Sequence, residues 1–309
     1  MKLLVLGANG QVGHELREAL KPLGEVVAAT RNGVLDDGAP CLRADLGDAD
    51  SLRAALDAAR ADIIVNAAAY TAVDRAEDEP ELADRVNHRA VADIGAWAAA
   101  HRAFVVHYST DYVFDGHGIR EGGAAPRAYR EDDATAPLGV YGRSKLAGED
   151  ALRASGAGHL ILRTAWVYAA RGHNFLHTML RLARERDELR VVADQIGAPT
   201  PARWIARTTA QALARRESLA EKPSGTFHLV AAGQASWHEF ASAIVAGAQA
   251  RGLLARAPRV APIASADFPT RARRPAWSVL DCARLKTAFG LESDDWRVGL
   301  DEILDELAR

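Results

Sequence analysis

Three evenly spaced glycines near the start of the chain constrain its fold more than any other feature. The Gly-x-x-Gly-x-x-Gly motif follows an apolar run at residues 2–6 and precedes residues 15–20, whose apolar side chains have helical spacing. In this context the first glycine permits a sharp turn, the second lets the backbone approach a pyrophosphate, and the third lets helix and strand pack closely. The N–H groups of the helix N-terminus then face the phosphates. The motif predicts a dinucleotide-binding turn made of Gly7, Gly10, Gln11, Val12 and Gly13.

Strand-like and helix-like segments alternate beyond this turn. Short apolar runs predict strands at residues 2–6, 25–30, 41–44, 62–66, 104–109 and 159–163. Helical spacing between them predicts helices at residues 15–20, 51–60, 81–101 and 141–155. Fully apolar strands separated by helices are typical of a parallel sheet that is covered on both faces. The sequence therefore predicts an α/β fold with a Rossmann-type, doubly wound parallel sheet.

The later part of the chain predicts a smaller, mixed α/β lobe that binds substrate. Helical spacing predicts helices at residues 174–186, 202–216 and 237–251, and a strand-like run lies at residues 225–230. A Pro- and Arg-rich loop at residues 258–275 precedes two short helices at residues 281–289 and 296–307. We expect a dinucleotide-binding domain in residues 1–170, to which residues 223–250 return. The substrate lobe is then expected in residues 171–222 and 251–309.

Composition excludes several classes of function. The net charge is −3 and there is no basic stripe, so a general nucleic-acid binder is not expected. No apolar run reaches the roughly 20 residues of a membrane-spanning helix, and the first apolar stretch is too short for a signal peptide. The chain has two cysteines, which favours a reducing cytoplasm. Because most of its 38 basic residues are arginines, a single lysine is more informative than a single arginine.

The glycine spacing is similar to that of the extended short-chain dehydrogenases/reductases. A stretch of small residues after Asn66 follows a buried strand, and small side chains allow the backbone to lie against a cofactor. The resemblance also implies an adenine contact just after the third strand, although Asp45 there could equally cap the following helix. Cofactor contacts are therefore expected from Asp45, Leu46, Ala67, Ala68, Ala69, Tyr70 and Thr71.

The end of the second predicted strand bears on the choice of cofactor. NAD-specific enzymes usually carry an acidic residue there, which binds the ribose 2′-hydroxyl. This chain has Thr30 and Arg31 instead. A guanidinium can pair with a 2′-phosphate, so the sequence favours NADPH over NADH. The alternative is that Arg31 is one of many arginines on a solvated loop.

Tyr141 and Lys145 form a Tyr-x-x-x-Lys motif at the start of a predicted helix. Residues four apart lie on one helix face. A nearby ammonium stabilises a phenolate and lowers the phenol pKa from its solution value of about 10, which makes Tyr141 a general acid near neutral pH. By resemblance to the superfamily, Thr110 supplies the hydroxyl that holds the substrate carbonyl oxygen; Ser109 is the local alternative.

Five longer segments, at residues 66–74, 109–114, 141–149, 162–168 and 194–200, together resemble the dTDP-4-dehydrorhamnose reductase family. The resemblance implies reduction of the C4 ketone of dTDP-4-dehydro-β-L-rhamnose by NADPH or NADH. It implies that Tyr141 protonates the ketone oxygen and that Lys145 also holds the nicotinamide ribose. It places Tyr108 near the cofactor and implies substrate contacts from Thr110, Asp111, Trp166, Asn174 and Arg274.

The sequence departs from the family pattern in two places. The stretch between Thr110 and Tyr141 carries extra residues, 122–126, whose tip is expected to be a surface loop. Some family members bind Mg²⁺ at a dimer interface, and Glu15 matches one ligand position, but Arg203 stands where a second carboxylate is expected. We therefore expect no metal site of this kind, and either a monomer or a homodimer.

Two other functions remain as alternatives. The first is another nucleotide-sugar enzyme of the extended family, such as an epimerase or a dehydratase. Dehydratases carry Asp-Glu after the catalytic threonine, whereas here Asp111 is followed by Tyr112. The second alternative is a non-catalytic regulatory subunit, against which the intact set of Thr110, Tyr141 and Lys145 argues.

Overall fold

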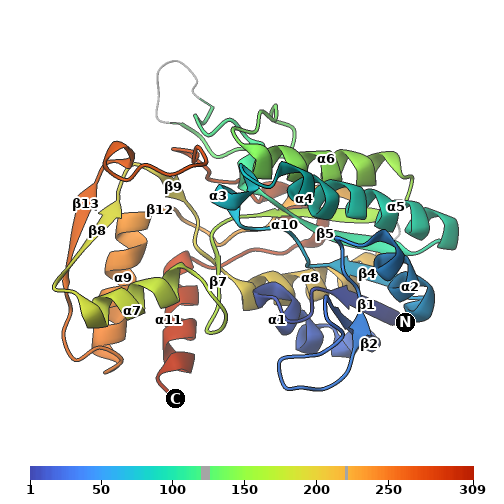
Figure 1. Cartoon of the computed structure of the whole chain (residues 1–309), viewed down its shortest axis with the longest axis horizontal. Helices are drawn as coiled ribbons and strands as arrows, with labels where there is room; N and C mark the ends of the chain where they lie inside the picture. The colour runs from blue at the N-terminus through green and yellow to red at the C-terminus, as the bar shows by residue number, and fades with distance from the viewer. Residues whose placement is uncertain (120–125, 220–221) are drawn as a thin grey trace.

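A parallel sheet of seven strands forms the centre of the computed structural model, which describes residues 1–119, 126–219 and 222–309 (Figure 1). All strand pairs in it are parallel, and the strand order is β11-β6-β5-β4-β1-β2-β3. The strands are β1 Lys2–Leu6, β2 Glu25–Thr30, β3 Leu42–Arg43, β4 Ile63–Asn66, β5 Phe104–Thr110, β6 His159–Thr164 and β11 Gly225–His228. The chain reverses its direction of strand addition between β1 and β4, the place where such sheets bind ligands. The predicted α/β, Rossmann-type fold is confirmed.

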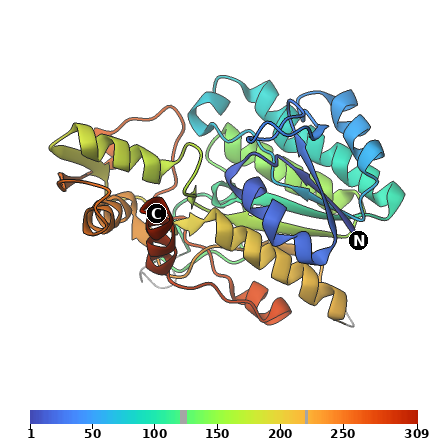
Figure 2. The ribbon, with the colours of Figure 1, turned by 90° about the horizontal axis from the view of Figure 1, so that it is seen from below.

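Helices cover both faces of this sheet, as Figure 2 shows. Alternate residues of β1 point to opposite faces: Leu3 and Val5 join one core cluster, and Leu4 and Leu6 join the other. The first cluster includes side chains of α1 Gln11–Ala19, α8 Ala202–Ser218 and α10 Ala283–Phe289. The second includes side chains of α2 Ala49–Ala59, α5 Ala90–His101 and α6 Val140–Ala154. This burial on both faces explains why the strands are apolar throughout.

The predicted helix at residues 81–101 is interrupted by one wider turn. It consists of α4 Pro80–Asp84, a π-helical turn at Arg85–Arg89, and α5. Such π-turns are frequent at functional sites. Here the turn carries Asn87, which is 1% exposed and faces α6. A π-helical turn contains one more residue than an α-helical turn. Sequence periodicity does not reveal this residue, because the apolar positions resume their helical spacing after the turn.

A second lobe packs beside the sheet, at the left of Figure 1. Its core joins α7 Phe175–Glu185, α9 Trp237–Ala250 and α11 Trp296–Leu307. Strands β8 Glu188–Val192 and β13 Arg259–Ile263 pair in parallel at its edge. Strand β13 lies inside the predicted Pro-rich loop, so this part of the prediction is wrong. Shorter pairs are formed by β7 Val167–Tyr168 with β10 Thr200–Pro201, and by β9 Ile196–Gly197 with β12 Ala235–Ser236.

The remaining elements are short. They are η1 Lys21–Leu23, α3 Val73–Ala76, η3 Asp111–Val113 and η4 Ser265–Asp267. The predicted division into two domains stays a prediction, and the packing of two helices bears on it. Helix α8 contributes to the core cluster that contains α1, whereas α9 belongs to the cluster of α7 and α11.

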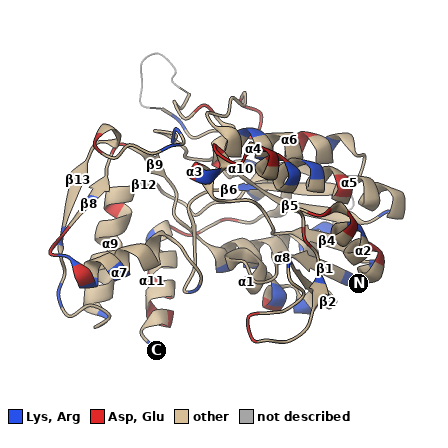
Figure 3. Cartoon of the chain, viewed as in Figure 1, with Lys and Arg blue, Asp and Glu red and all other residues tan. Residues whose placement is uncertain are grey.

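Positions of Lys and Arg and positions of Asp and Glu are interspersed along the ribbon of both lobes (Figure 3). Within the described ranges, no helix combines the length and the hydropathy that are needed to cross a bilayer. An anionic ligand must therefore be bound by local groups rather than by the overall field, since the net charge is −3.

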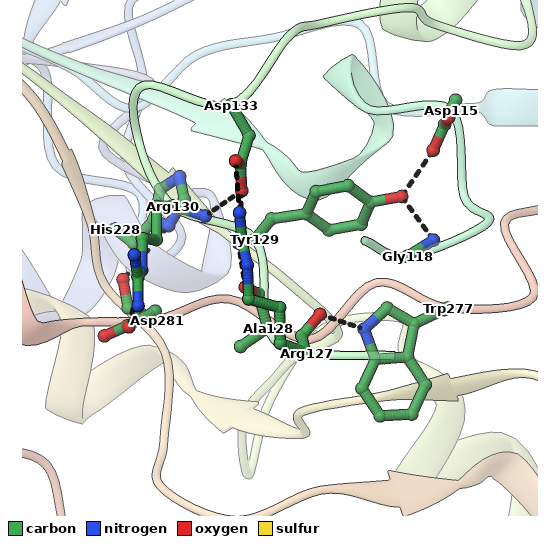
Figure 4. Close-up of polar contacts among 10 residues, drawn as sticks. All are labelled: Asp115, Gly118, Arg127, Ala128, Tyr129, Arg130, Asp133, His228, Trp277 and Asp281. Atoms are coloured by element: carbon green, nitrogen blue, oxygen red, sulfur yellow. Dashed lines mark hydrogen bonds and ion pairs between the residues drawn. The ribbon is translucent and has the colours of Figure 1, made fainter. Parts of the chain in front are cut away.

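The extra residues between Thr110 and Tyr141 are described only in part. Residues 122–125 of the predicted surface loop lie outside the described residues. The base of the insertion is anchored by Tyr129, which is fully buried, stacks on Phe114 at 4.2 Å between ring centroids, and donates to Asp115 at 2.5 Å (Figure 4). Trp277 donates to the carbonyl of Arg127 at 3.1 Å. These contacts hold the base of the insertion against the C-terminal segment.

Candidate active site

The turn between β1 and α1 requires glycine at positions 7 and 13 and leaves little room for a side chain at position 10. Gly7 has a φ of 78°, and a Cβ there would lie 2.8 Å from the backbone nitrogen of Ala68 on the adjacent strand end. A Cβ at Gly13 would lie only 2.1 Å from the carbonyl oxygen of Gly7. A Cβ at Gly10 would lie 3.2 Å from the same oxygen. The turn is therefore as compact as the sequence predicts.

The first turn of α1 suits a phosphate. Gly10 is its N-cap and offers no side chain to the free N–H groups, and no acidic residue lies in the first turn. The Gln11 side chain is held aside, because its Oε1 accepts from Nδ2 of Asn174 at 2.8 Å. Open backbone donors and a positive helix end are the features that bind a pyrophosphate. These residues fit a dinucleotide cofactor.

Asn174 was predicted to contact substrate, and its side chain is engaged elsewhere in this structure. Its Oδ1 caps α7 through the N–H of His177, and its Nδ2 also donates to the carbonyls of Ala169 and Arg171. Asn174 therefore links the loop before α7 to Gln11 in the phosphate turn. Its predicted role in substrate binding stays a prediction.

The backbone after β4 is shaped by two buried asparagines. Oδ1 of Asn66 accepts from the N–H of Ala68 at 3.2 Å, and its Nδ2 lies 3.1 Å from Nδ1 of His107. Asn87 holds both backbone groups of Tyr70, at 2.8 and 3.0 Å, and also donates to Oγ of Ser144 on α6 at 3.1 Å. The segment from Ala67 to Thr71, which was predicted to contact cofactor, is thereby fixed between the phosphate turn and α6.

The predicted adenosine end lies at β2 and β3. Thr30 is 3% exposed, and its hydroxyl shapes the turn through Asn32 and Val34. Arg31 is exposed. Asp45 caps the local turn at the N–H of Gly47 at 2.9 Å, while the cap of α2 is Asp48. The alternative in which Asp45 caps the helix is therefore wrong.

Tyr141 lies in the first turn of α6 and meets the end of β5. Burial raises the pKa of Tyr141, and the neighbouring hydroxyl of Thr110 opposes this shift. The ring of Tyr112 packs edge-on against it, with 5.6 Å between centroids. Lys145 does not contribute to this shift, so the predicted lowering of the Tyr141 pKa by its ammonium group is not found. Tyr141 is thus held as a neutral phenol, the form that can donate a proton.

The contacts of Lys145 explain why its ammonium group does not lower the pKa of Tyr141. It is 2% exposed, and its Nζ donates to the carbonyl of Tyr108 at 2.6 Å and lies 3.2 Å from Nε2 of His107. Burial lowers its pKa to about 8, while the charge of Glu149 opposes the shift. Burial also lowers the pKa of His107 well below its ordinary value, so that imidazole is neutral. The ammonium group is therefore directed toward the strand end beneath the predicted nicotinamide site.

A buried ion pair fixes α6 on the sheet. Both carboxylate oxygens of Glu149 accept from Arg163 on β6, at 2.7 and 2.9 Å, and both side chains are 3% exposed or less. Bidentate pairs of this kind fix geometry as well as charge. The face of α6 that carries Lys145 is thereby held against the strand end that carries Thr110.

Asp111 lies beside the two hydroxyl groups. It is 2% exposed, and its Oδ1 accepts from the hydroxyl of Thr110 at 3.0 Å. Burial raises its pKa to about 6, against the effect of the neighbouring hydroxyl groups of Ser278 and Thr110. Tyr141, Thr110 and Asp111 therefore lie together at the carboxyl end of β5.

Trp166 and Arg274 approach this group from the second lobe and the C-terminal segment. Trp166 has a φ of 47°, which is strained for a side chain of its size, and it stacks on Trp237 at 3.5 Å between centroids. Arg274 belongs to residues 270–278, which we call the strap. The strap crosses from the second lobe to the sheet, where the N–H of Trp277 donates to the carbonyl of Gly116 at 2.9 Å.

Residues 1–309 match the family model described as the RmlD substrate binding domain. The chain belongs to this family. A dTDP-4-dehydrorhamnose reductase of Burkholderia thailandensis is 48% identical over 97% of either chain. The crystal structure of a dTDP-4-dehydrorhamnose reductase from Clostridium acetobutylicum has a TM-score of 0.86 and 33% identity, and each chain is fully covered. That of the reductase from Bacillus anthracis, in complex with NADP, has a TM-score of 0.84 and 31% identity over 99% of either chain. The predicted family is confirmed.

Sequence reasoning missed several residues around the site of this RmlD-family chain. Trp237 backs Trp166, Asp74 and Glu77 bind two other segments, and Asn87 holds the backbone of Tyr70. For Asp74, the one available signal was its place in a family-like segment. Nothing in the local sequence marks Trp237, because it follows a helix cap like many core aromatics.

One of the two ligand positions that the resemblance implies for Mg²⁺ carries Arg203 in this RmlD-family chain. Arg203 on α8 forms an ion pair with Glu306 on α11. Among the residues that the structure describes, no group of three or more His, Cys, Asp or Glu side chains is arranged to hold a metal ion. The expectation that Mg²⁺ is not bound in the family manner stays a prediction.

Proposed function

We propose that this chain reduces the C4 ketone of dTDP-4-dehydro-β-L-rhamnose to dTDP-L-rhamnose, with a nicotinamide cofactor. The observation that carries the proposal is that Thr110 and Tyr141 lie beside each other at the carboxyl end of the sheet that also carries a phosphate-type turn. The names of the similar reductases support the choice of substrate. A nucleotide-sugar partner, a cytoplasmic location and a division into two domains belong to the same proposal.

The reaction needs one hydride and one proton. A reduced nicotinamide cofactor, when bound, would supply the hydride, and the turn at Gly7, Gly10 and Gly13 would hold its pyrophosphate. Thr110 holds the carbonyl oxygen, and Tyr141 transfers its phenolic proton to that oxygen, so that the ketone becomes a secondary alcohol. The phenolate left on Tyr141 regains its proton from solvent, and the buried ammonium of Lys145 is proposed to hold the nicotinamide ribose.

The proposal is tested by the loss of NADPH absorbance with dTDP-4-dehydrorhamnose. We expect oxidation of one NADPH for each dTDP-L-rhamnose formed. An epimerase retains its cofactor and causes no net oxidation, and a regulatory subunit gives none at all; either outcome contradicts the proposal. Activity restricted to a different nucleotide sugar contradicts the substrate assignment while leaving the reaction type intact.

Lys145 should give kcat a pH dependence. Its pKa of about 8 means that the ammonium is charged below this pH and neutral above it. Because the charged form is proposed to hold the nicotinamide ribose, kcat is expected to fall as pH rises through about 8. Lys145→Met should be much slower and should lack this decline. A wild-type rate that is flat or rising between about pH 7 and 9 contradicts the role of Lys145.

Arg31 is proposed to bind the 2′-phosphate of NADPH. Arg31→Ala should raise KM for NADPH about tenfold and leave KM for NADH within about twofold, because a charge-assisted contact to phosphate is lost. Arg53→Ala, which removes an exposed arginine from α2, is the matched control and should change neither KM. Equal effects of Arg31→Ala on both cofactors contradict the preference.

A further inference from the structure

Two carboxylates next to the cofactor-facing strand end bind segments that are far away in the sequence. Asp74 lies in α3 and Glu77 directly follows it. Oδ1 of Asp74 accepts from the N–H of Ala272 at 3.0 Å, and its Oδ2 accepts from Nη2 of Arg274 at 2.7 Å. One carboxylate therefore holds both the backbone and the guanidinium of the strap, about 200 positions away.

Glu77 acts on the helix that carries Tyr141. Its Oε1 accepts from the N–H of Val140, the first residue of α6, at 2.8 Å. The N-cap of α6 is Gly139, which provides no side-chain acceptor, and no acidic residue lies in the first turn. A Cβ at Gly139 would lie 2.6 Å from Oε1 of Glu77. Glu77 thus caps α6 from another segment, and its negative charge suits the helix N-terminus.

The two contacts converge on the same side of the site. Nη1 of Arg274 lies 3.3 Å from the hydroxyl of Tyr112, whose ring packs against Tyr141. A guanidinium has five N–H donors, and these contacts use one donor toward Asp74 and one toward Tyr112. The remaining donors can bind phosphate oxygens. Asp74 therefore sets the direction in which Arg274 presents them.

We propose that Asp74 and Glu77 are positioning residues with separate tasks. Asp74 orients Arg274 toward the diphosphate of the nucleotide sugar, and Glu77 fixes the first turn of α6 and with it Tyr141. The inference rests on the proposed function, because it assigns the diphosphate to Arg274. It predicts that loss of Asp74 impairs substrate binding and that loss of Glu77 impairs the chemical step.

The test for Asp74 compares Asp74→Ala with Asp78→Asn. Asp78 pairs with Arg271 of the strap, and both side chains are more exposed than those of Asp74 and Arg274. We expect Asp74→Ala to raise KM for the nucleotide sugar about tenfold, with kcat within about twofold, and Asp78→Asn to change neither. In an Arg274→Ala background the Asp74 substitution should have no further effect. The proposal is overturned if the Asp74 and Arg274 substitutions multiply each other's effects on KM, or if Asp74→Ala leaves KM unchanged.

The test for Glu77 uses a conservative rescue. Glu77→Ala should lower kcat about tenfold and leave KM within about twofold. Glu77→Gln should restore most of the rate, because its amide oxygen can still accept from Val140. An unchanged kcat in Glu77→Ala, or a rise in KM alone, overturns this half of the proposal.

A separate readout keeps the inference distinguishable from the proposed function. If the wild type does not oxidise NADPH with this sugar, the proposed function fails by itself. Hydrogen exchange then tests the positioning contacts: the amide of residue 272 should exchange faster in Asp74→Ala, and that of residue 140 faster in Glu77→Ala. Unchanged exchange at both amides overturns the positioning roles.

Discussion

Tyr141→Phe is expected to lower kcat at least about a hundredfold, with little change in KM for either substrate. The phenyl ring keeps the packing against Tyr112 and removes the hydroxyl that meets Thr110. Without this hydroxyl, the oxygen of the ketone must take its proton from water. The rate of NADPH oxidation under saturating conditions measures the effect.

Tyr168→Phe is the matched control for this variant. Tyr168 is 1% exposed in the core of the second lobe, and its hydroxyl has no hydrogen-bond partner among the described residues. Removal of this hydroxyl should leave kcat within about twofold. A Tyr141→Phe variant that is as fast as the control removes Tyr141 from its role as general acid.

Gly13→Ala should nearly abolish cofactor binding and lower the melting temperature. The added methyl group would lie 2.1 Å from the carbonyl oxygen of Gly7, which is a backbone atom that can move only together with the phosphate turn. A displaced turn no longer aims its N–H groups at the phosphates. We expect the Kd for NADPH, measured by its fluorescence, to rise about a hundredfold or more.

Gly252→Ala separates this effect from ordinary backbone strain. Gly252 has a φ of 73° and open space around it, in the second lobe. Its replacement should lower stability by about 1 kcal/mol and leave the Kd for NADPH unchanged. A Gly13→Ala variant that binds NADPH as tightly as the wild type contradicts the assignment of the phosphate turn.

Local sequence patterns predicted the elements that are dominated by local physics. The apolar runs at residues 2–6 and 25–30 coincide with β1 and β2, and the helix at residues 296–307 coincides with α11. Strand β13 was missed because Pro262 lies inside it, and proline counts against a strand. It is tolerated here because β13 pairs with β8 alone, so it is an edge strand.

The candidate site was predictable where the chemistry lies within one motif. The spacing of Tyr141 and Lys145 placed both on α6, but it did not reveal how deeply Lys145 is buried. Its partner is the carbonyl of Tyr108 on β5, which a helix motif does not specify.

Contacts between distant segments could not be predicted from local sequence patterns. Asp74 and Arg274 are 200 positions apart, and the pair forms only because the strap returns across the end of the sheet. The stack of Trp166 on Trp237 likewise depends on how the second lobe packs. Single-sequence patterns carry no information about such pairings, because their geometry is set by tertiary packing.

The central claim, hydride transfer to C4 with protonation of its oxygen, is tested most directly with NADPH deuterated at the transferred position. The account predicts dTDP-L-rhamnose with one deuterium at C4 of the sugar for each NADPH oxidised, as read by NMR and mass spectrometry. Deuterium at any other carbon, or product formed without transfer of deuterium, contradicts it.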